Sequence, residues 1–389
     1  MDSEQTSAYN AIISEHNAVI LGQMGTGKTF TISECLKHLR SRGKTVYICC
    51  YTGIACLQYP GMDAMTLHHF AGLQDGRHSN DSLVKLVLSD ERYEGTKERI
   101  LCTDTLVIDE VSMVSMKTLE SVEYLCRQVR SQNICFGGIQ VILSGDFCQL
   151  APIADELYGD SGRYCFETDF FDMVFPHKIN LTTVHRQTDI NLIQCINELE
   201  KGVPSAETNS YMKSLSRPLP NEFQSQSVKL FAQNIDVDMY NNEQLQLVVG
   251  ALKIYAADDY GDIHYLKKMI VPKKLVLKKS VKVMLLKNVD KHLVNGLVGT
   301  VTELTDDGIE VKFDINGKWK VASLGRCNFT RFDPVSNACV ARRFQFPLKL
   351  AYAITIHKSQ GMSIPYLEIS CSRATNPGLD RGCSWEISD

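Results

Sequence analysis

The sequence predicts an α/β fold built on parallel sheets, and two features of its first half carry this prediction. Short apolar runs with the length of buried strands recur at 18–21, 105–108 and 139–143. A glycine-rich or acidic segment follows each run directly, and a helical pattern at 30–43 follows the first of them. Strands that alternate with helices are typical of parallel sheets, in which ligands bind at the carboxyl ends of the strands.

The composition is that of a globular protein. The chain has 389 residues, of which 44% are hydrophobic and 22% charged, and its formal net charge is −4. This length suffices for two or three domains. No apolar run approaches the roughly 20 residues that span a bilayer, so no membrane contact is expected. Residues 1–17 are not typical of a secretory signal. The fourteen cysteines have no disulfide or zinc spacing, which indicates reduced thiols in an intracellular compartment.

A phosphate-binding loop is predicted at residues 22–29. Their sequence, GQMGTGKT, matches G-x-x-x-x-G-K-T between a strand-like run and an amphipathic helical pattern. Glycines let backbone N–H groups surround phosphate oxygens, and the helix N-terminus adds positive partial charge. Lys28 is therefore expected to contact the β- and γ-phosphates of ATP, and Thr29 to hold Mg²⁺. The nucleotide-binding residues predicted here are Gly22, Gly25, Thr26, Gly27, Lys28 and Thr29.

Acidic and amide side chains follow the other two strand-like runs. Asp109 and Glu110 end the first of these runs, and Asp146 and Gln149 follow the second. Because the carboxyl ends of parallel strands meet at one edge, we expect these groups beside the phosphate loop. Asp109 is predicted to bind Mg²⁺, Glu110 to polarise the attacking water, and Gln149 to sense the γ-phosphate. The alternative for Asp146 and Gln149 is an ordinary polar turn.

The second half supplies further polar candidates. Arg186 follows a strand-like stretch and is predicted to reach a phosphate across a domain cleft. The segment 348–364, LKLAYAITIHKSQGMSI, is a strand-like run followed by a polar turn with a glycine. Its side chains suit a phosphodiester backbone, and the alternative is a surface helix that ends at the glycine. The donors are Thr355, His357, Lys358, Ser359 and Gln360.

A small antiparallel barrel is predicted at 281–345. Short β-prone runs such as VKVMLL, LVGTVTEL and GIEVKF are separated by turn sequences such as DDG and NGK. The barrel interrupts the second domain, because strand-like sequence resumes at 348. Residues 271–287 carry six lysines, which either cover solvated strand faces or line a basic groove.

Taken in order, the motifs resemble those of superfamily 1B DNA helicases of the Pif-type (petite integration frequency, RecD-like) family. GQMGTGKT resembles motif I, VIDEVSM motif II, GDFCQLAPI motif III, HRQ the arginine of motif IV, and LKLAYAITIHKSQGMS motif V. YTGIACL and TLHHFAGL resemble motif Ia and its DNA-contacting neighbour. The resemblance implies two RecA-like P-loop NTPase domains with parallel sheets, at 1–180 and 181–389. It also implies an SH3-like β-barrel at 281–345 and a strand-separating wedge at 74–100.

The resemblance further implies an ATP-dependent DNA helicase. Such a protein would move 5′-to-3′ on single-stranded DNA, unwind duplex at single-strand junctions, and serve DNA repair and recombination as a monomeric motor in the nucleus or mitochondrion. Gln5 lies where the family reads adenine, and Gln360 and Gly361 would complete the nucleotide site. Phe70 would stack on a base, with a core position as the alternative. The implied strand track comprises Thr52, Gly53, Thr66, His68, Phe70, Thr355, His357 and Lys358.

The last residues depart from the family pattern. SRAT at 372–375 is similar to the final arginine motif, but only 15 residues separate His357 from Arg373, and the segment also fits the stretch before that motif. Two hypotheses follow. Arg373 serves as the last catalytic arginine, or the chain is a truncated or regulatory form that binds ATP and single-stranded DNA with impaired hydrolysis. A more distant class is a P-loop enzyme acting on a small molecule.

Overall fold

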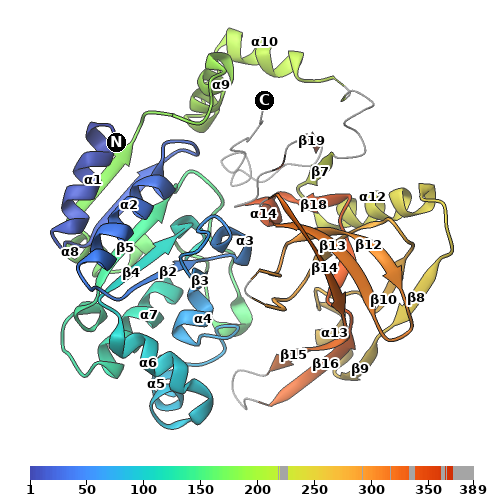
Figure 1. The fold of residues 1–389 in the computed structure, drawn as a ribbon, viewed down its shortest axis with the longest axis horizontal. Helices are drawn as coiled ribbons and strands as arrows, with labels where there is room; N and C mark the ends of the chain where they lie inside the picture. Colours follow the sequence, from blue (N-terminus) through green and yellow to red (C-terminus); the bar gives the residue numbers. More distant parts are fainter. Residues whose placement is uncertain are drawn as a thin grey trace. The chain divides into compact units, whose positions relative to one another are not determined.

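The chain divides into two compact units, shown in Figure 1. The first covers Met1–Pro218, and the second begins at Leu219. The computed structural model describes residues 1–217, 219, 227–290, 292–315, 317–332, 338–360, 364 and 366–370, without the side chains of His357 and Lys358. Within these ranges, none of the helices has the length and apolar character needed to cross a membrane.

The first unit is built on one parallel sheet. Its strands are β1 (Ala18–Gly22), β2 (Val46–Cys50), β3 (Met65–Thr66), β4 (Thr105–Asp109), β5 (Gln140–Gly145) and β6 (His177–Leu181). They run in the order β3-β2-β4-β5-β1-β6, and all neighbouring pairs are parallel. The three predicted strands are β1, β4 and β5, the buried middle of this sheet. The predicted α/β class with a parallel sheet is therefore confirmed.

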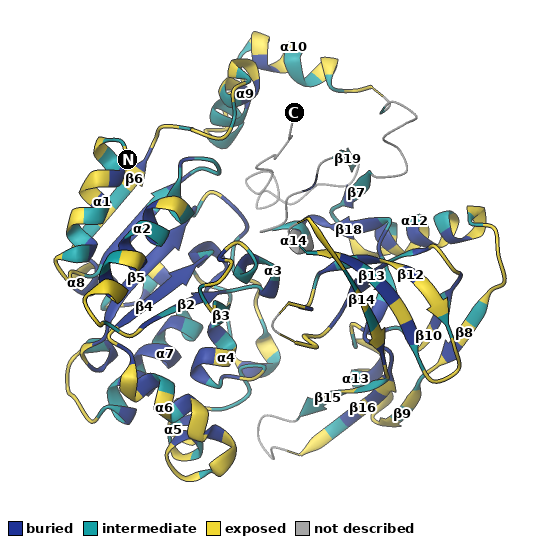
Figure 2. Ribbon diagram, in the orientation of Figure 1, coloured by how far each residue is buried: buried dark blue, intermediate teal, exposed yellow. Residues whose placement is uncertain are grey.

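Helices cover both faces of this sheet. They are α1 (Ser3–Ile13), α2 (Lys28–Ser41), α3 (Gly53–Cys56), α4 (Leu67–Ala71), α5 (Asn80–Ser89), α6 (Glu94–Cys102), α7 (Met116–Val129) and α8 (Phe171–Val174). Two further helices, α9 (Ile190–Glu200) and α10 (Ala206–Ser214), pack against each other. Neighbouring strand residues point to opposite faces, so Ile20 packs in the core under α1 and α2 and Val19 in the core under α4 to α7. Figure 2 shows the sheet as the buried centre of the unit.

Short 3₁₀ turns join these elements at η1 (Glu91–Tyr93), η2 (Val111–Met113), η3 (Cys135–Gly138), η4 (Glu156–Tyr158) and η5 (Cys165–Glu167). The region 74–100, predicted as a wedge, is helical, and Leu83 and Ile100 bury their side chains in the core of the first unit. Its strand-separating role stays a prediction. The first unit also continues beyond residue 180, because α9 and α10 belong to it.

The second unit contains a smaller parallel sheet of β7 (Val228–Phe231), β18 (Ala353–Thr355) and β19 (Leu367–Ser370), in the order β18-β7-β19. Helix α12 (Asn234–Leu247) packs against it. The buried Asn241 amide accepts from Tyr352 N (2.8 Å) and Ala353 N (2.9 Å), and donates to Leu350 O (3.3 Å) and Ala353 O (3.1 Å). The Asn241 side chain therefore holds the backbone segment that leads into β18.

Antiparallel strands make up the rest of the second unit. A five-stranded sheet in the order β14-β13-β12-β11-β17 comprises β11 (Lys282–Leu285), β12 (Val298–Leu304), β13 (Ile309–Ile315), β14 (Lys318–Leu324) and β17 (Leu348–Leu350). The remaining elements are β8 (Lys253–Ala256), β9 (Asp258–Gly261), α13 (Ile263–Lys267), β10 (Lys274–Leu277), β15 (Cys327–Phe332), β16 (Cys339–Gln345) and α14 (Ile356–Ser359). Antiparallel strands were predicted at 281–345, and their closure into an SH3-like barrel stays a prediction.

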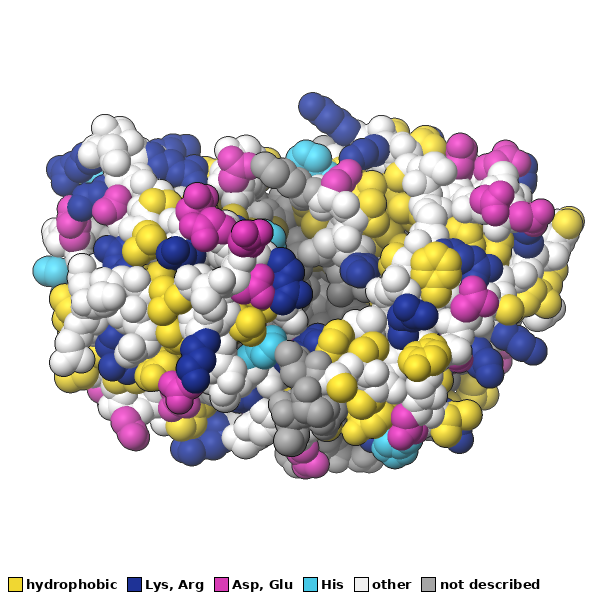
Figure 3. All heavy atoms as spheres, turned by 90° about the horizontal axis from the view of Figure 1, so that it is seen from below, with side chains coloured by type: hydrophobic (Ala, Val, Ile, Leu, Met, Phe, Trp, Pro, Cys, Tyr) yellow, Lys and Arg dark blue, Asp and Glu magenta, His cyan; other side chains and the backbone are white. Residues whose placement is uncertain are grey.

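Several lysines of residues 271–287 have structural partners. Lys278 Nζ donates to Val248 O at 2.6 Å and Lys282 Nζ to Ser227 O at 3.2 Å, while Lys279 Nζ lies 3.2 Å from a Glu303 carboxylate oxygen. Burial lowers the pKa of Lys282. On the face drawn in Figure 3, basic and acidic side chains are interspersed. For these three lysines, the contacts favour a strand-packing role over a basic groove.

Candidate nucleotide site

The predicted phosphate loop lies between β1 and α2, at the carboxyl edge of the first sheet. Gly27 is the N-cap of α2 and has φ +84°. Residues other than glycine rarely adopt this backbone conformation. A Cβ at Gly27 would lie 2.5 Å from Gln5 Nε2, so it would also displace the Gln5 amide. The loop therefore requires glycine here, and it brings backbone N–H groups to the start of a helix, as phosphate binding needs.

The Lys28 ammonium group lies inside this loop. Its Nζ donates to Gly22 O at 2.6 Å and to Gln23 O at 2.9 Å. Burial lowers the pKa of Lys28, and the carboxylates of Asp109, Asp146 and Glu110 oppose that shift. The Lys28 ammonium group thus interacts with all three predicted carboxylates. A bound phosphate could replace the two loop carbonyl oxygens as its hydrogen-bond partners.

Gln5 contacts the phosphate loop from α1. Its Nε2 donates to Thr26 O at 3.1 Å, and its Oε1 accepts from Asp2 N at 3.1 Å as part of a capping box. The amide therefore ties the start of α1 to the loop. The predicted reading of adenine by Gln5 stays a prediction.

One of the two predicted metal ligands is held by a tyrosine. The Tyr59 hydroxyl donates to Asp109 Oδ2 at 2.6 Å, and the other predicted ligand, Thr29, opposes the rise in the pKa of this phenol that burial causes. A carboxylate and a hydroxyl are hard oxygen donors of the kind Mg²⁺ prefers, so these residues fit the predicted ion. Tyr59 lies in a segment without periodicity, and no pattern in the sequence indicates it.

Glu110 has an unusual backbone. It follows β4 with φ +57° and ψ +43°, in the left-handed region that is uncommon for a residue with a side chain. A Cβ at Gly145, at the end of the neighbouring β5, would lie 2.9 Å from Val111 N, so the two strand ends approach closely. Strained residues cluster at functional sites, and this one supports the hypothesis that Glu110 acts on a ligand.

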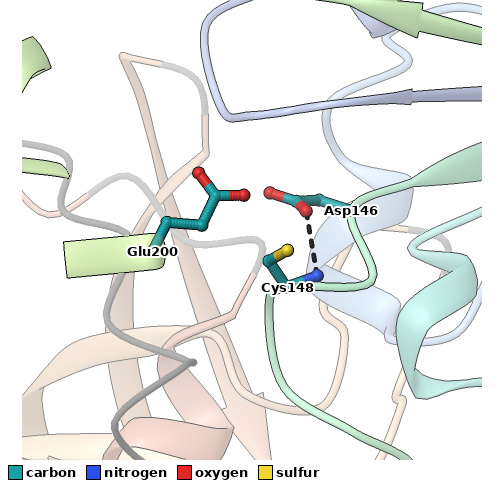
Figure 4. Close-up of side chains that lie close together, drawn as sticks. All are labelled: Asp146, Cys148 and Glu200. Atoms are coloured by element: carbon teal, nitrogen blue, oxygen red, sulfur yellow. Dashed lines mark hydrogen bonds between the residues drawn. The ribbon is translucent and has the colours of Figure 1, made fainter. Parts of the chain in front are cut away.

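The Asp146 charge acts on Lys28, and Glu200 of α9 lies close to Asp146 (Figure 4). Gln149 Nε2 donates to Asp146 Oδ2 at 3.3 Å, and Cys148 N donates to Asp146 Oδ1 at 3.0 Å. The Glu200 carboxylate points toward Asp146. Burial raises the pKa of Asp146, Glu200 raises it further, and hydrogen bonds and Lys28 oppose the shift. The segment is thus more than a surface turn, because Asp146 and Gln149 are both buried.

The contact between α9 and the loop was not predicted. Gln23 Nε2 donates to Asn197 Oδ1 at 2.6 Å and to the Glu200 carboxylate. Ligand atoms of Asp146, Cys148 and Glu200 lie within 4.8 Å of one another, as a metal site would require. Hydrogen bonds from Gln149, the Cys148 backbone and Gln23 already engage both carboxylates, so the contacts explain this group without an ion.

Arg186 belongs to the first unit. Its predicted place is in the second domain, across a cleft, but it lies within Met1–Pro218. His185 N and Arg186 N donate to Gly25 O at 2.8 and 3.3 Å, and the Arg186 charge lowers the pKa of Lys28. The arginine is therefore close to the phosphate loop within one compact unit, and its contact with the γ-phosphate stays a prediction.

The predicted strand track of the first unit divides into cap residues and core residues. Thr52 caps α3 by accepting from Ala55 N at 3.3 Å, and Thr66 caps α4 by accepting from His69 N at 3.3 Å. The half-buried His68 ring lies edge-on to Tyr51, with ring centroids 5.6 Å apart, and burial lowers the pKa of His68.

Two residues of the predicted track in the first unit are buried. Gly53 begins α3 and is buried. Phe70 is fully buried in the core and contacts Tyr47 at a ring-centroid distance of 5.5 Å. The prediction that Phe70 stacks on a base is therefore wrong for this conformation, because the ring has no open face, and the core alternative applies.

The candidates of the second unit are only partly described. Thr355 is buried at the end of β18, and α14 with Gln360 follows it. The side chains of His357 and Lys358, and all of Gly361 and Arg373, lie outside the described residues. Their predicted contacts with DNA and nucleotide stay predictions.

A parallel sheet that places a glycine loop with lysine and threonine beside an Asp-Glu pair defines the class of P-loop nucleotide-binding proteins. The model of the PIF1-like helicase family matches residues 1–200, and the model of the DNA helicase Pif1 2B domain matches residues 266–304. The chain belongs to the PIF1-like helicase family.

Individual relatives agree with this assignment. The chain is 31% identical to the ATP-dependent DNA helicase PIF1 of Xenopus laevis over 97% of its length, and it spans 58% of that relative. A crystal structure of Pif1 helicase from Candida albicans matches with a TM-score of 0.84 and 27% identity, covering 98% of this chain and 91% of that one. A Bacteroides Pif1 helicase in complex with ADP-AlF3 and ssDNA matches with a TM-score of 0.81 and 26% identity, covering 98% and 89%.

Proposed function

We propose that this protein is an ATP-dependent DNA helicase that hydrolyses ATP with Mg²⁺ and moves 5′-to-3′ along single-stranded DNA. Duplex would be unwound at its junction with the single strand, in DNA repair and recombination, by a monomeric motor in the nucleus or mitochondrion. The observation that carries the proposal is that Lys28, Asp109 and Glu110 lie at the carboxyl edge of one parallel sheet, where their charges interact. Family membership and a Bacteroides relative described in complex with ADP-AlF3 and ssDNA support it.

In this proposal each residue of the site has one task. Lys28 exchanges its loop carbonyls for phosphate oxygens of ATP. Glu110 accepts a proton from the attacking water and orients it. Gln149 and Arg186 contact the γ-phosphate, where negative charge must be stabilised during transfer. Thr29 and Asp109 would hold Mg²⁺, which when bound offsets the charge of the phosphate oxygens.

The DNA part of the proposal uses both units. In the first unit, the predicted contacts come from Thr52 and Thr66, the N-caps of α3 and α4, and from His68 in α4. In the second, they come from Thr355, His357 and Lys358, around the start of α14. Contacts of this type grip the phosphate backbone without reading sequence. The net charge of −4 is compatible with such binding, because only the contacting surface has to be positive.

The test is ATP hydrolysis by the whole chain with and without single-stranded DNA, beside Lys28→Ala and Arg373→Ala. We expect DNA to stimulate hydrolysis and Lys28→Ala to abolish it. Loss in Arg373→Ala would assign the last catalytic arginine to this residue. Binding of ATP and DNA with hydrolysis at the Lys28→Ala level would favour the second candidate, a binding form with impaired hydrolysis. A chain that binds no DNA at low salt would contradict both.

Direction is tested separately, with a duplex carrying a single-stranded tail at one end. Unwinding that requires a 5′ tail is expected. Equal unwinding from a 3′ tail would overturn the proposed polarity and leave the ATPase proposal standing.

A further inference from the structure

Packing alone does not explain why residue 59 carries a hydroxyl group. Tyr59 is 2% exposed and belongs to the core between the sheet and α2, where a phenylalanine ring would fill the same space. A buried hydroxyl needs a partner, since leaving it without one is costly. Its partner is Asp109 Oδ2 at 2.6 Å. The phenol therefore holds one oxygen of a predicted Mg²⁺ ligand.

The phenol is a permanent donor. A tyrosine hydroxyl keeps its proton at neutral pH, so it donates to the carboxylate of Asp109 at 2.6 Å. A carboxylate has two oxygens, so Asp109 can accept from Tyr59 at Oδ2 and keep Oδ1 for another ligand. Groups that hydrogen-bond to a metal ligand fix its orientation and change the metal affinity.

Tyr59 is also tied to α3. Its N–H donates to Cys56 O, the last residue of that helix, at 3.2 Å, and its carbonyl accepts from Met62 N at 3.2 Å. Thr52 caps the other end of the same short helix. A displacement of α3 would therefore move the phenol, and with it the hydrogen bond to Asp109. In the proposed function, Thr52 of this segment contacts the DNA strand.

We propose that Tyr59 is a positioning residue that couples α3 to the metal ligand Asp109, so that a single strand bound at α3 tightens the binding of Mg²⁺-nucleotide. The metal half rests on the contacts of Tyr59, and the DNA half rests on the proposed function. Coupling of this kind is reciprocal, so Mg²⁺-nucleotide must tighten strand binding by the same factor.

The test uses Tyr59→Phe in the full chain, which removes the hydroxyl and keeps the ring. Binding of a fluorescent ADP analogue is titrated with Mg²⁺, and Mn²⁺ binding is followed by electron paramagnetic resonance, so neither readout needs hydrolysis. We expect the metal affinity to fall by about tenfold, the lower end of the effect of removing such a hydrogen-bond partner. Nucleotide binding in EDTA should be unchanged.

A matched control is Tyr124→Phe. The Tyr124 hydroxyl also donates to an aspartate, Asp81 Oδ1, at 2.7 Å, but on the surface between α7 and α5. This variant should behave as the parent chain. Thermal unfolding in EDTA checks that both variants fold. Should Tyr59→Phe not fold, ¹⁹F NMR of the parent labelled with 3-fluorotyrosine replaces it, and a buried tyrosine resonance must shift when Mg²⁺ is added to the ADP complex.

The coupling is tested by adding oligo(dT). In the parent and in Tyr124→Phe, the oligonucleotide should lower the Mg²⁺ concentration needed for half-maximal ADP binding, and in Tyr59→Phe this shift should disappear. Equal Mg²⁺ affinity in Tyr59→Phe and parent, or no tyrosine response by ¹⁹F NMR, would overturn the metal role. A DNA-induced shift that persists in Tyr59→Phe would overturn the coupling. A parent chain that binds neither nucleotide nor oligo(dT) would overturn the proposed function itself.

Discussion

The carboxyl ends of β4 and β18 carry predicted ligand-binding residues but are held in place differently. β4 is an interior strand of a six-stranded sheet, and its terminal Asp109 is fixed by a side-chain hydrogen bond from Tyr59. β18 is an edge strand of a three-stranded sheet, and the backbone leading to Thr355 is fixed by the amide of Asn241. The first arrangement orients one functional group, whereas the second sets the course of the chain. Substitutions should therefore impair chemistry at β4 and folding at β18.

The largest expected effect is on chemistry at the end of β4. Glu110→Gln should lower the rate of DNA-stimulated ATP hydrolysis by about 10³-fold, because an amide cannot accept the proton of the attacking water. Binding of a fluorescent ATP analogue should be preserved. Glu207→Gln, at an exposed position in α10, is the control and should hydrolyse ATP as the parent does. A Glu110→Gln chain with parental turnover would remove Glu110 from the mechanism.

The next effect is on folding at β18. Asn241→Leu fills a similar volume but removes all four hydrogen bonds to residues 350–353. It leaves buried backbone groups unpaired, so the second unit should lose about 3 kcal/mol of stability to urea. Asn209→Ala, which removes a surface bond to Ser205 O, should cost far less. Urea unfolding followed by circular dichroism measures both, and equal losses would contradict the anchoring role.

A smaller effect is expected where α9 meets the phosphate loop. Gln23→Ala and Glu200→Ala remove the two sides of one contact, so each should change ADP affinity by about fivefold, and the double variant by no more than either alone. Isothermal titration measures the cycle, and Lys201→Ala serves as the exposed control. Additive effects would show that the two residues act independently.

The smallest effect is a pH dependence at Asp146. Its pKa is raised mainly by burial, so its contribution to stability is fully present below the unfolded value of 3.8 and is lost as pH rises through the folded value. Asp146→Asn carries no such charge. The melting temperature of the variant minus that of the parent should therefore increase from pH 4 to pH 7. A constant or falling difference would mean that the hydrogen bonds and Lys28 outweigh burial.

Local pattern was sufficient for much of the first unit. The strand, loop and helix around Lys28 follow from apolar runs and glycine positions within one short segment. The contacts that complete the site join residues far apart in sequence, such as Tyr59 with Asp109 and Gln23 with Glu200, and no periodicity marks them. Phe70 is a different case. The motif that contains it can be recognised in the sequence, but the motif does not show that the ring is buried. Arg186 was assigned to the wrong side of a boundary because loops carry no sign of the unit they pack against.

The amide of Asn241 has a consequence for how the chain can change. It bonds residue 241 to residues 350–353 and so closes a loop of about a hundred residues, from α12 to β18, that contains the antiparallel strands. The entropic free-energy cost of closing a loop grows slowly, by about 0.6 kcal/mol for each doubling of the loop length. Once one buried amide holds the two ends together, the intervening segment can lengthen, shorten or be exchanged at little energetic expense to the parallel sheet. The antiparallel part of the second unit can thus be replaced as a module, while the backbone path of β18 stays the same.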